Sequence, residues 1–243
     1  MLRILPSRSE IRAARSELKR RGLSFMPSFS ERLFMRWGHS NGLHMGDPIK
    51  SWDVLMTAKF LDEHLPKDSP IVDIGAYCSE IVPILDRMGF SSLTGIDLNP
   101  RVKEMPGSAR VHYEVGDFLR TTFPDARFTA ITAISVIEHG FNMKGLLKEM
   151  SRLLRPGGLF IFSCDYWPEK IDTSGIKMFD MDWRIFSEKE MRDFLGQSRT
   201  YGFVPHGAVD YSPGNRTIDC MGKQYTFAWG ALEKKINSPD MGA

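Results

Sequence analysis

The sequence predicts an α/β fold: a doubly wound, mostly parallel sheet of seven strands, preceded by a helical amino-terminal extension. Strand-like and helix-like segments alternate between residues 71 and 164, which is the pattern of a parallel sheet with crossover helices. Two late strand-like segments can add an antiparallel pair at the sheet edge. With 243 residues, 42% of them hydrophobic, the chain can bury a sheet of this size.

The parallel strands are expected where short apolar runs lie between residues that favour turns. Helices are expected between them at residues 79–88 and 142–154, where apolar residues recur at three- and four-residue steps. Pro156 and the two glycines after it stop the second of these helices. The five expected parallel strands are residues 71–74, 92–96, 111–115, 130–135 and 159–164.

The segments on either side complete this plan. Apolar residues at helical spacing predict a helix over residues 51–65, before the first strand. Ser187 and Glu190 have the spacing of a capping box, which predicts a helix from there to about residue 195. The two late strands are expected at residues 202–206 and 225–231.

The amino-terminal segment is strongly basic. Residues 1–40 carry nine Arg or Lys and three Glu, a net charge of +6, so the other residues sum to −4. Such an arm suits an anionic partner; alternatively, it is a helix with a solvated basic face. Residues 1–65 are expected to form a helical extension and lid, with Trp52 and Asp53 near its edge, and residues 66–243 the main domain. The apolar stripe of the helix would be Ile11, Ala14, Leu18 and Leu23.

The composition argues against a membrane-spanning, secreted or metal-dependent protein. The sequence contains no uncharged apolar run of about 18 residues, the length needed to span a bilayer, and its first apolar run is too short for a signal peptide. The three cysteines form no CxxC pair, which suits a reducing cytoplasm. The six histidines lack metal-ligand spacing. We therefore expect a cytoplasmic protein without a metal site.

The first strand ends in a turn with a single glycine, Gly75. A dinucleotide fingerprint would also need glycine at positions 77 and 80, where the chain has Tyr77 and Glu80. The turn is therefore poorly suited to a pyrophosphate, and an NAD-dependent dehydrogenase is the least favoured interpretation. The sequence favours a nucleoside that carries no phosphate.

Three carboxylates follow successive strands of the expected sheet. Asp73 lies just before the first turn, Asp97 ends the second strand and Asp117 follows the third. Because the carboxyl ends of parallel strands meet at one edge, these side chains should share a crevice. Asp97 can accept hydrogen bonds from both ribose hydroxyls. Asp117 beside Phe118 suits an adenine amine and ring, and Asp73 suits an ammonium group.

Five short motifs occur in a fixed order along the chain. They are Val72-Asp-Ile-Gly75, Gly95-Ile-Asp97, Gly116-Asp-Phe118, Ile134-Ser-Val-Ile-Glu-His139 and the run of residues 147–159. Together they resemble the class I S-adenosylmethionine-dependent methyltransferases, most closely the type 11/12-like small-molecule group, over residues 71–203. The resemblance implies a Rossmann-like methyltransferase fold. The chain departs from the family's usual pattern at Tyr77, Ser79 and Thr129.

The resemblance also implies S-adenosylmethionine as the cofactor and a role for individual residues. In the family, the matches to Asp73 and Gly75 surround the methionine end, the match to Asp97 holds the ribose and the match to Asp117 reaches the adenine. Ser135 is expected beside the cofactor at the end of the fourth strand. The expected cofactor-binding residues are Asp73, Gly75, Ala76, Tyr77, Asp97, Leu98, Asp117, Phe118 and Ser135.

The acceptor site is expected after the fourth and fifth strands. His139 is the candidate catalytic base, because histidine titrates near neutrality; the alternative is that it only lines the pocket or caps a helix. Glu138 is expected to orient a neighbour or meet the substrate. Asp165, Tyr166 and Trp183 are expected acceptor contacts, since carboxylates and aromatic rings together suit a sugar.

The leading hypothesis is therefore O-methylation of a small molecule such as a sugar or a glycosylated metabolite. Two alternatives stay open. One is a nucleic-acid methyltransferase that uses the basic arm, although the sequence shows no motif for a flipped base amine. The other is a non-catalytic nucleoside-binding protein of the same fold.

Overall fold

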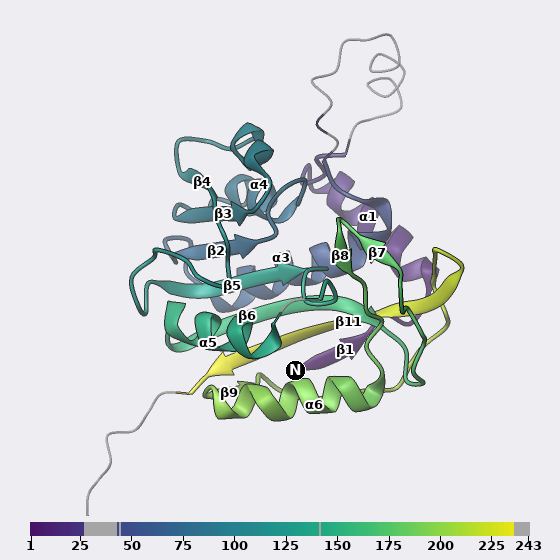
Figure 1. Ribbon diagram of the computed structural model, residues 1–243. Helices are drawn as coiled ribbons and strands as arrows, with labels where there is room; N and C mark the ends of the chain where they lie inside the picture. Colours follow the sequence, from purple (N-terminus) through teal and green to yellow (C-terminus); the bar gives the residue numbers. More distant parts are fainter. Residues whose placement is uncertain (27–42, 44, 141, 236–243) are drawn as a thin grey trace, which may run out of the picture.

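The computed structural model describes residues 1–26, 43, 45–140 and 142–235, and its main sheet has nine strands. Seven of them form a continuous path (Figure 1). In spatial order they are β1 (Leu2–Ile4), β11 (Lys223–Lys234), β6 (Leu154–Tyr166), β5 (Phe128–Ile134), β2 (Ile71–Ile74), β3 (Leu93–Asp97) and β4 (Val111–Val115). Pairing is parallel from β6 to β4 and antiparallel between β11 and both its neighbours on this path. The predicted fold class is confirmed.

The five predicted parallel strands are confirmed: β2 and β4 have the predicted ends, and the other three have shifted ends. The largest shift is in β6, which starts at Leu154 rather than Leu159. Leu154 pairs with Phe128, and the next paired residues are Leu159 and Ala130. The segment with Pro156 therefore forms an irregularity inside the strand rather than a gap before it.

Helices cover both faces of the sheet, so the fold has three layers (Figure 1). The helices α1, α3 and α4 pack on one face, and α5 and α6 pack on the other. The predicted capping box at Ser187 and Glu190 is confirmed, and the helix that it opens continues to Thr200. The helices are α1 (Arg8–Arg20), α3 (Ser51–His64), α4 (Ile81–Arg87), α5 (Met143–Leu153) and α6 (Glu188–Thr200), with 3₁₀ turns η1 (Pro48–Lys50) and η2 (Pro100–Glu104).

Three short strands pair with the last strand, β11, besides its neighbour β6. They are β1, β9 (Phe203–Pro205) and β10 (Ile218–Cys220), all antiparallel to it. The predicted late strand pair is confirmed as β9 with β11. No pattern in the sequence predicts β1, because three residues are too few to show an alternating pattern.

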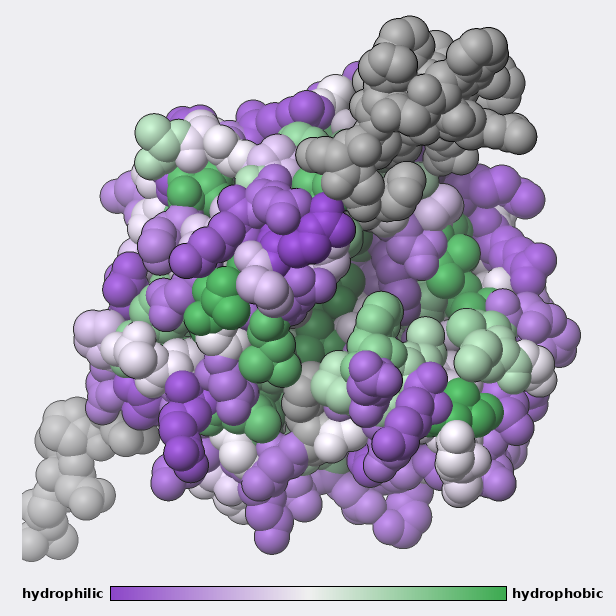
Figure 2. Space-filling model, turned by 45° about the horizontal axis from the view of Figure 1, so that its top comes forward, coloured by the Kyte–Doolittle hydropathy of each residue, from purple (hydrophilic) through white to green (hydrophobic). Residues whose placement is uncertain are grey.

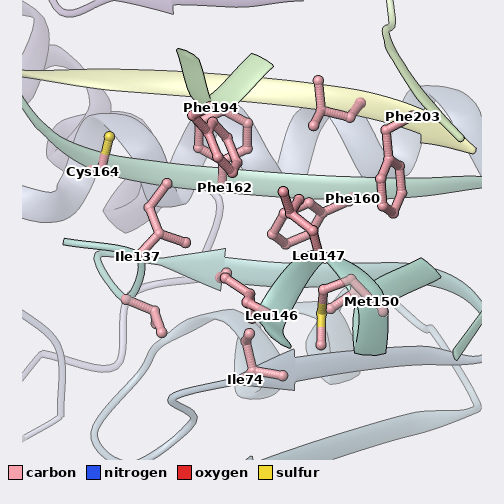
Figure 3. Close-up of a cluster of buried hydrophobic side chains, with 14 of the residues drawn as sticks. Ile74, Ile137, Leu146, Leu147, Met150, Phe160, Phe162, Cys164, Phe194 and Phe203 are labelled. Atoms are coloured by element: carbon pink, nitrogen blue, oxygen red, sulfur yellow. The ribbon is translucent and has the colours of Figure 1, made fainter. Parts of the chain in front are cut away.

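The two larger hydrophobic cores of the described residues lie on opposite faces of the sheet. In Figure 3, Leu146, Leu147 and Met150 of α5 gather with Phe160 and Phe162 of β6. The predicted stripe of α1 is confirmed on the other face, where Ile11, Ala14 and Leu18 are buried against α3. The amino-terminal segment thus contributes a strand to the sheet and a helix to a core. Its division from the main domain at residue 65 stays a prediction, and residues 27–42 of the arm lie outside the described residues.

The segment between β6 and α6 carries a small hairpin, β7 (Lys177–Met178) with β8 (Met181–Asp182), at the carboxyl edge of the sheet. The turn residues Phe179 and Asp180 both have positive φ, which is the geometry of a tight two-residue hairpin. Among the described helices, none has the length and hydrophobicity that a membrane crossing requires.

Candidate functional site

The turn after β2 packs closely on its neighbours. Gly75 has φ +72°, and a Cβ there would lie 2.6 Å from Cγ2 of Val136, so only glycine fits without strain. The backbone N–H groups of Gly75 and Ala76 both donate to the carbonyl of Ile96, at 3.0 and 3.2 Å. The turn is thereby held against the end of β3, which carries Asp97.

Asp97 is half-buried and braces this turn. Its Oδ2 accepts from the backbone N–H of Tyr77 at 3.0 Å, and its Oδ1 accepts from the backbone N–H of Asn99 at 2.8 Å. A carboxylate has about four acceptor positions, so capacity remains for two ligand hydroxyls. Leu98, the next residue, is 53% exposed and offers apolar surface beside the carboxylate.

Asp73 is buried, and its two carboxylate oxygens differ in their hydrogen bonding. Its Oδ1 accepts from the hydroxyl of Thr132 at 2.6 Å, whereas its Oδ2 is buried with no hydrogen-bond partner among the described residues. Burial raises the pKa of Asp73 to about 7, and the charge of Asp97 acts in the same direction. A buried carboxylate oxygen without a donor is costly, so the position fits a ligand ammonium group or a water that bridges to one.

The residues expected near the adenine are divided between surface and core. Asp117 is exposed, and its Oδ1 accepts from the backbone N–H of Leu119 at 2.8 Å. Phe118 is buried in the core on the α5 face. Ser135, at the end of β5, has φ +55° and donates its N–H to the carbonyl of Ser163 at 3.1 Å. Its left-handed backbone is an unusual conformation for serine.

Glu138 and His139 follow β5 and are both buried. Burial and then the charge of Asp165 raise the pKa of Glu138 to about 8. Burial lowers the pKa of His139, so its imidazole is neutral at pH 7. The His139 ring meets the ring of Phe179 edge-on, with centroids 5.4 Å apart, and Phe179 is 77% exposed at the hairpin tip.

Asp165 and Trp183, two of the expected acceptor contacts, lie side by side. The Trp183 indole N–H donates to Oδ2 of Asp165 at 2.7 Å. Tyr166 lies elsewhere: consecutive residues of a strand point to opposite faces, and the hydroxyl of this fully buried side chain donates to the carbonyl of Tyr211 at 2.8 Å. A contact between Tyr166 and an acceptor stays a prediction.

Two polar residues that were not predicted as ligand contacts lie beside Asp165. Lys50, at the end of η1, places its Nζ 3.5 Å from Oδ1 of Asp165. Asp53, on α3, is buried and accepts from the hydroxyl of Ser163 at 2.8 Å. Burial raises the pKa of Asp53 to about 6. A carboxylate within the mostly apolar start of α3 was the signal that could have marked this position.

One of the two residues that break the dinucleotide fingerprint, Glu80, binds the amino-terminal helix. Its carboxylate forms a two-bond ion pair with Arg15, with N–O distances of 3.0 and 2.7 Å, and also accepts from the backbone N–H of Phe25 at 2.9 Å. Glu80 is buried and the Arg15 side chain is 11% exposed. This departure from the glycine pattern therefore fastens α1 beside the first turn.

Neither of two surface hollows is lined by the candidate site residues described above. A hollow of about 460 Å³ lies at the amino ends of the strands, beside Pro70 and Thr129, and one of about 400 Å³ lies beside Lys103 and Tyr113. On the face in Figure 2, hydrophobic residues line a hollow between hydrophilic flanks. In the described part of the chain, no three His, Cys, Asp or Glu side chains are grouped to hold a metal ion.

Comparison with known proteins identifies the fold that carries these residues. Residues 72–162, from β2 into β6, match a family model described as a methyltransferase domain. This stretch is less than half of the chain, and solved S-adenosylmethionine-dependent methyltransferases share the fold. The matched stretch includes the first turn, Asp97, Asp117 and the Glu138–His139 pair.

Similar curated proteins match only part of their own length. A sterol 24-C-methyltransferase of Aspergillus fumigatus is 33% identical over 95 residues, which cover 36% of this chain and 24% of that protein. A demethylmenaquinone methyltransferase of Tropheryma whipplei is 27% identical over 100 residues, which cover 40% and 41%. The matched region of the chain thus spans only about a quarter to two fifths of the length of these relatives.

Solved structures confirm the fold over most of the chain. The geranyl diphosphate C-methyltransferase of Streptomyces coelicolor superposes with a TM-score of 0.56 and 20% identity, covering 82% of this chain and 87% of that one. The cyclase SpnF superposes with a TM-score of 0.61 and 16% identity, covering 82% and 86%. One of these structures is named as a methyltransferase and the other as a cyclase, so the shared fold does not determine the reaction.

Proposed function

We propose that this protein transfers the methyl group of S-adenosylmethionine to an oxygen of a small hydroxylated molecule, with a sugar or glycosylated metabolite favoured. The observation that carries the proposal is a set of buried polar atoms beside the strand ends that have no hydrogen-bond partner among the described residues. These atoms are Oδ1 of Asp53, Oε2 of Glu138 and Nδ1 of His139.

The cofactor would be held by the residues around the first turn. Asp97 would accept from the ribose hydroxyls, Asp73 would face the ammonium group, and Tyr77 would cover the methionine end. Ala76, Leu98 and Phe118 would contribute apolar surface, with Asp117 near the adenine amine and Ser135 beside the cofactor. When bound, S-adenosylmethionine supplies an electrophilic methyl group on a positively charged sulfur.

The polar wall supports a hydroxylated acceptor over a hydrocarbon one. Each buried polar group left without a partner costs about 1–3 kcal/mol. An alkene or a sterol side chain offers no donor to Asp53 or Glu138, whereas hydroxyl groups do. The names of the curated relatives place methyl transfer on a sterol and on demethylmenaquinone; the buried acids of this chain favour a more polar acceptor.

His139 is proposed as the base that removes the acceptor proton. Its lowered pKa keeps the imidazole neutral at pH 7, which is the form that accepts a proton. Replacing His139 by Ala should lower the rate of O-methylation by about 10²–10⁴-fold. A rate within a few-fold of wild type would leave His139 with a pocket-lining role.

Cofactor binding is the first test. Isothermal titration of the protein with S-adenosylmethionine should show binding, and Asp97→Ala should abolish most of it because both ribose contacts are lost. Turnover is then measured with methyl-labelled cofactor and a panel of hydroxylated acceptors. A wild-type protein that binds neither the cofactor nor its demethylated product would instead support the non-catalytic nucleoside-binding alternative.

The basic arm leaves nucleic acid as a less favoured acceptor. Arg15 is paired with Glu80, and Arg8 donates to the carbonyl of Thr217 at 2.6 Å, so part of the positive charge serves the fold. Arg12, Lys19 and Arg20 are exposed on α1. Steep salt dependence of RNA binding, lost when these three are neutralised, would favour the nucleic-acid alternative.

A further inference from the structure

We propose that Lys50 and Asp53, which precede the first parallel strand, belong to the acceptor site and select an acceptor with neighbouring hydroxyl groups. This inference rests on the proposed methyl transfer and specifies its substrate class. It concerns the side chains at the junction of η1 and α3, which lie outside the stretch that matches the methyltransferase domain.

The first argument is the docking of this junction on one face of two paired strands. Asp165 of β6 is the register partner of Phe227 of β11. Lys50 bridges this pair, since its Nζ lies 3.5 Å from Asp165 Oδ1 and 3.6 Å from the centroid of the Phe227 ring. Ser163 lies two residues before Asp165, so both point to the same face of β6, and Ser163 holds Asp53.

The second argument is charge. The carboxyl groups of Asp53, Glu138 and Asp165 surround one ammonium group, that of Lys50. Burial alone would lower the pKa of Lys50, but the acids outweigh it and the pKa is raised. Among the described residues, the acids of this cluster therefore exceed the cations, and burial keeps a proton on Glu138 at pH 7. The ionisable groups that face this cluster are Asp47, His139, Cys164 and Tyr225.

The third argument is incomplete hydrogen bonding. Asp53 Oδ1 and Glu138 Oε2 are buried without a partner among the described residues, although a lysine lies nearby. A cluster that served the fold alone would satisfy these oxygens. Adjacent hydroxyls of a ligand can donate to the two carboxyl groups and accept from Lys50, which matches the mixed set of acceptors and donor. A hydrocarbon matches neither.

The first experiment measures the coupling of Lys50 to Glu138 without any acceptor. Carbon-13 NMR of protein labelled at Glu carboxyl carbons should show a group that titrates near pH 8 and is absent in Glu138→Gln. In Lys50→Met that titration should move to higher pH, because the ammonium charge favours the ionised acid. Lys59→Met is the matched control, since Lys59 lies on α3 but pairs with Glu17 at the surface. An unchanged Glu138 titration in Lys50→Met would overturn the assignment of Lys50.

The second experiment tests substrate class. Methyl transfer is measured onto methyl glycosides, primary alkylamines and geraniol, alongside binding of S-adenosylhomocysteine. We expect transfer onto a glycoside that falls by about tenfold or more in Lys50→Met and in Asp53→Asn, with binding of S-adenosylhomocysteine kept. Lys59→Met should transfer at the wild-type rate.

The outcomes separate this inference from the proposed function. Preferred transfer onto an amine or onto geraniol, which carries a single hydroxyl, or no transfer onto any glycoside, would overturn the selection of neighbouring hydroxyl groups. Equal rates in Lys50→Met and Lys59→Met would remove Lys50 from the acceptor site. Failure of the wild-type protein to bind S-adenosylhomocysteine would instead contradict the proposed methyl transfer, while the NMR titration would still report on the cluster.

Discussion

Asp73 and Asp53 are each oriented by a hydroxyl group on a strand of the sheet. In each case a hydroxyl on a strand, Thr132 for Asp73 and Ser163 for Asp53, donates to one carboxylate oxygen and fixes its orientation. The other oxygen is buried without a partner among the described residues. The strand hydroxyl thus positions the carboxylate and leaves the other oxygen able to bind a ligand, while burial raises the pKa of both acids in the free protein.

The raised pKa of Asp73 predicts that cofactor binding releases a proton. The cofactor's positive groups favour the ionised carboxylate, so a group with a pKa of about 7 in the free protein should lose its remaining proton on binding at pH 7. Calorimetry in buffers of different ionisation enthalpy should show this release in wild type and in the surface control Asp193→Asn. An equal release in Asp73→Asn would contradict the assignment.

At the scale of elements, the ion pair of Glu80 and Arg15 joins α1 to the start of α4. Both partners are largely buried, and the carboxylate accepts a third hydrogen bond from Phe25. The helix α3 lies between α1 and the sheet and packs on α4 as well. The amino-terminal segment is therefore positioned by buried contacts near the first turn. Arg15 also donates to the hydroxyl of Ser51 at 2.8 Å, between Lys50 and Asp53, the two residues proposed for the acceptor site.

Breaking this pair should destabilise the protein strongly. Glu80→Gln leaves the Arg15 guanidinium uncompensated, and loss of one partner of a buried pair costs about 3–5 kcal/mol. Urea unfolding should show this loss, whereas Glu17→Gln, which affects a more exposed pair with Lys59, should cost at most about 1 kcal/mol. Equal stabilities of the two variants would show that the buried pair does not hold the segment.

At the scale of the whole molecule, several buried carboxyl groups make stability depend on pH. Asp53, Asp73 and Glu138 have pKa values raised to about 6, 7 and 8 by burial. In the unfolded chain they would lose their protons near pH 4. Between these values the folded state holds more protons, so its stability is greatest at low pH and falls as pH rises through the folded pKa values.

The free energy of unfolding of the cofactor-free protein should therefore decrease between about pH 5 and pH 8. Glu138→Gln removes the group with the highest of the three values and should flatten the decrease by on the order of a few kcal/mol. Chemical denaturation at each pH measures the slope, and the exposed Glu104→Gln is the control. A slope that stays the same in Glu138→Gln would show that Glu138 does not keep its proton in the fold.

The local pattern was enough to predict the parallel strands, the helices between them and the edge that carries Asp73, Asp97 and Asp117. These follow from apolar periodicity and from the rule that the carboxyl ends of parallel strands share an edge. The same reasoning grouped Asp165 with Tyr166, because it treated neighbours in sequence as neighbours in space. Strand alternation separates them, and Tyr166 bonds to Tyr211 on the other face.

By itself, the sequence determined the fold class and the carboxylates of the first three strands, because each depends on residues close together in the chain. Only the tertiary structure placed Lys50 against Asp165 and Asp53 against Ser163, which are more than a hundred residues apart. The tertiary structure alone also shows that β1 pairs with β11, although almost the whole chain separates the two strands. Such contacts depend on how the layers pack, and packing brings together side chains that no local pattern connects.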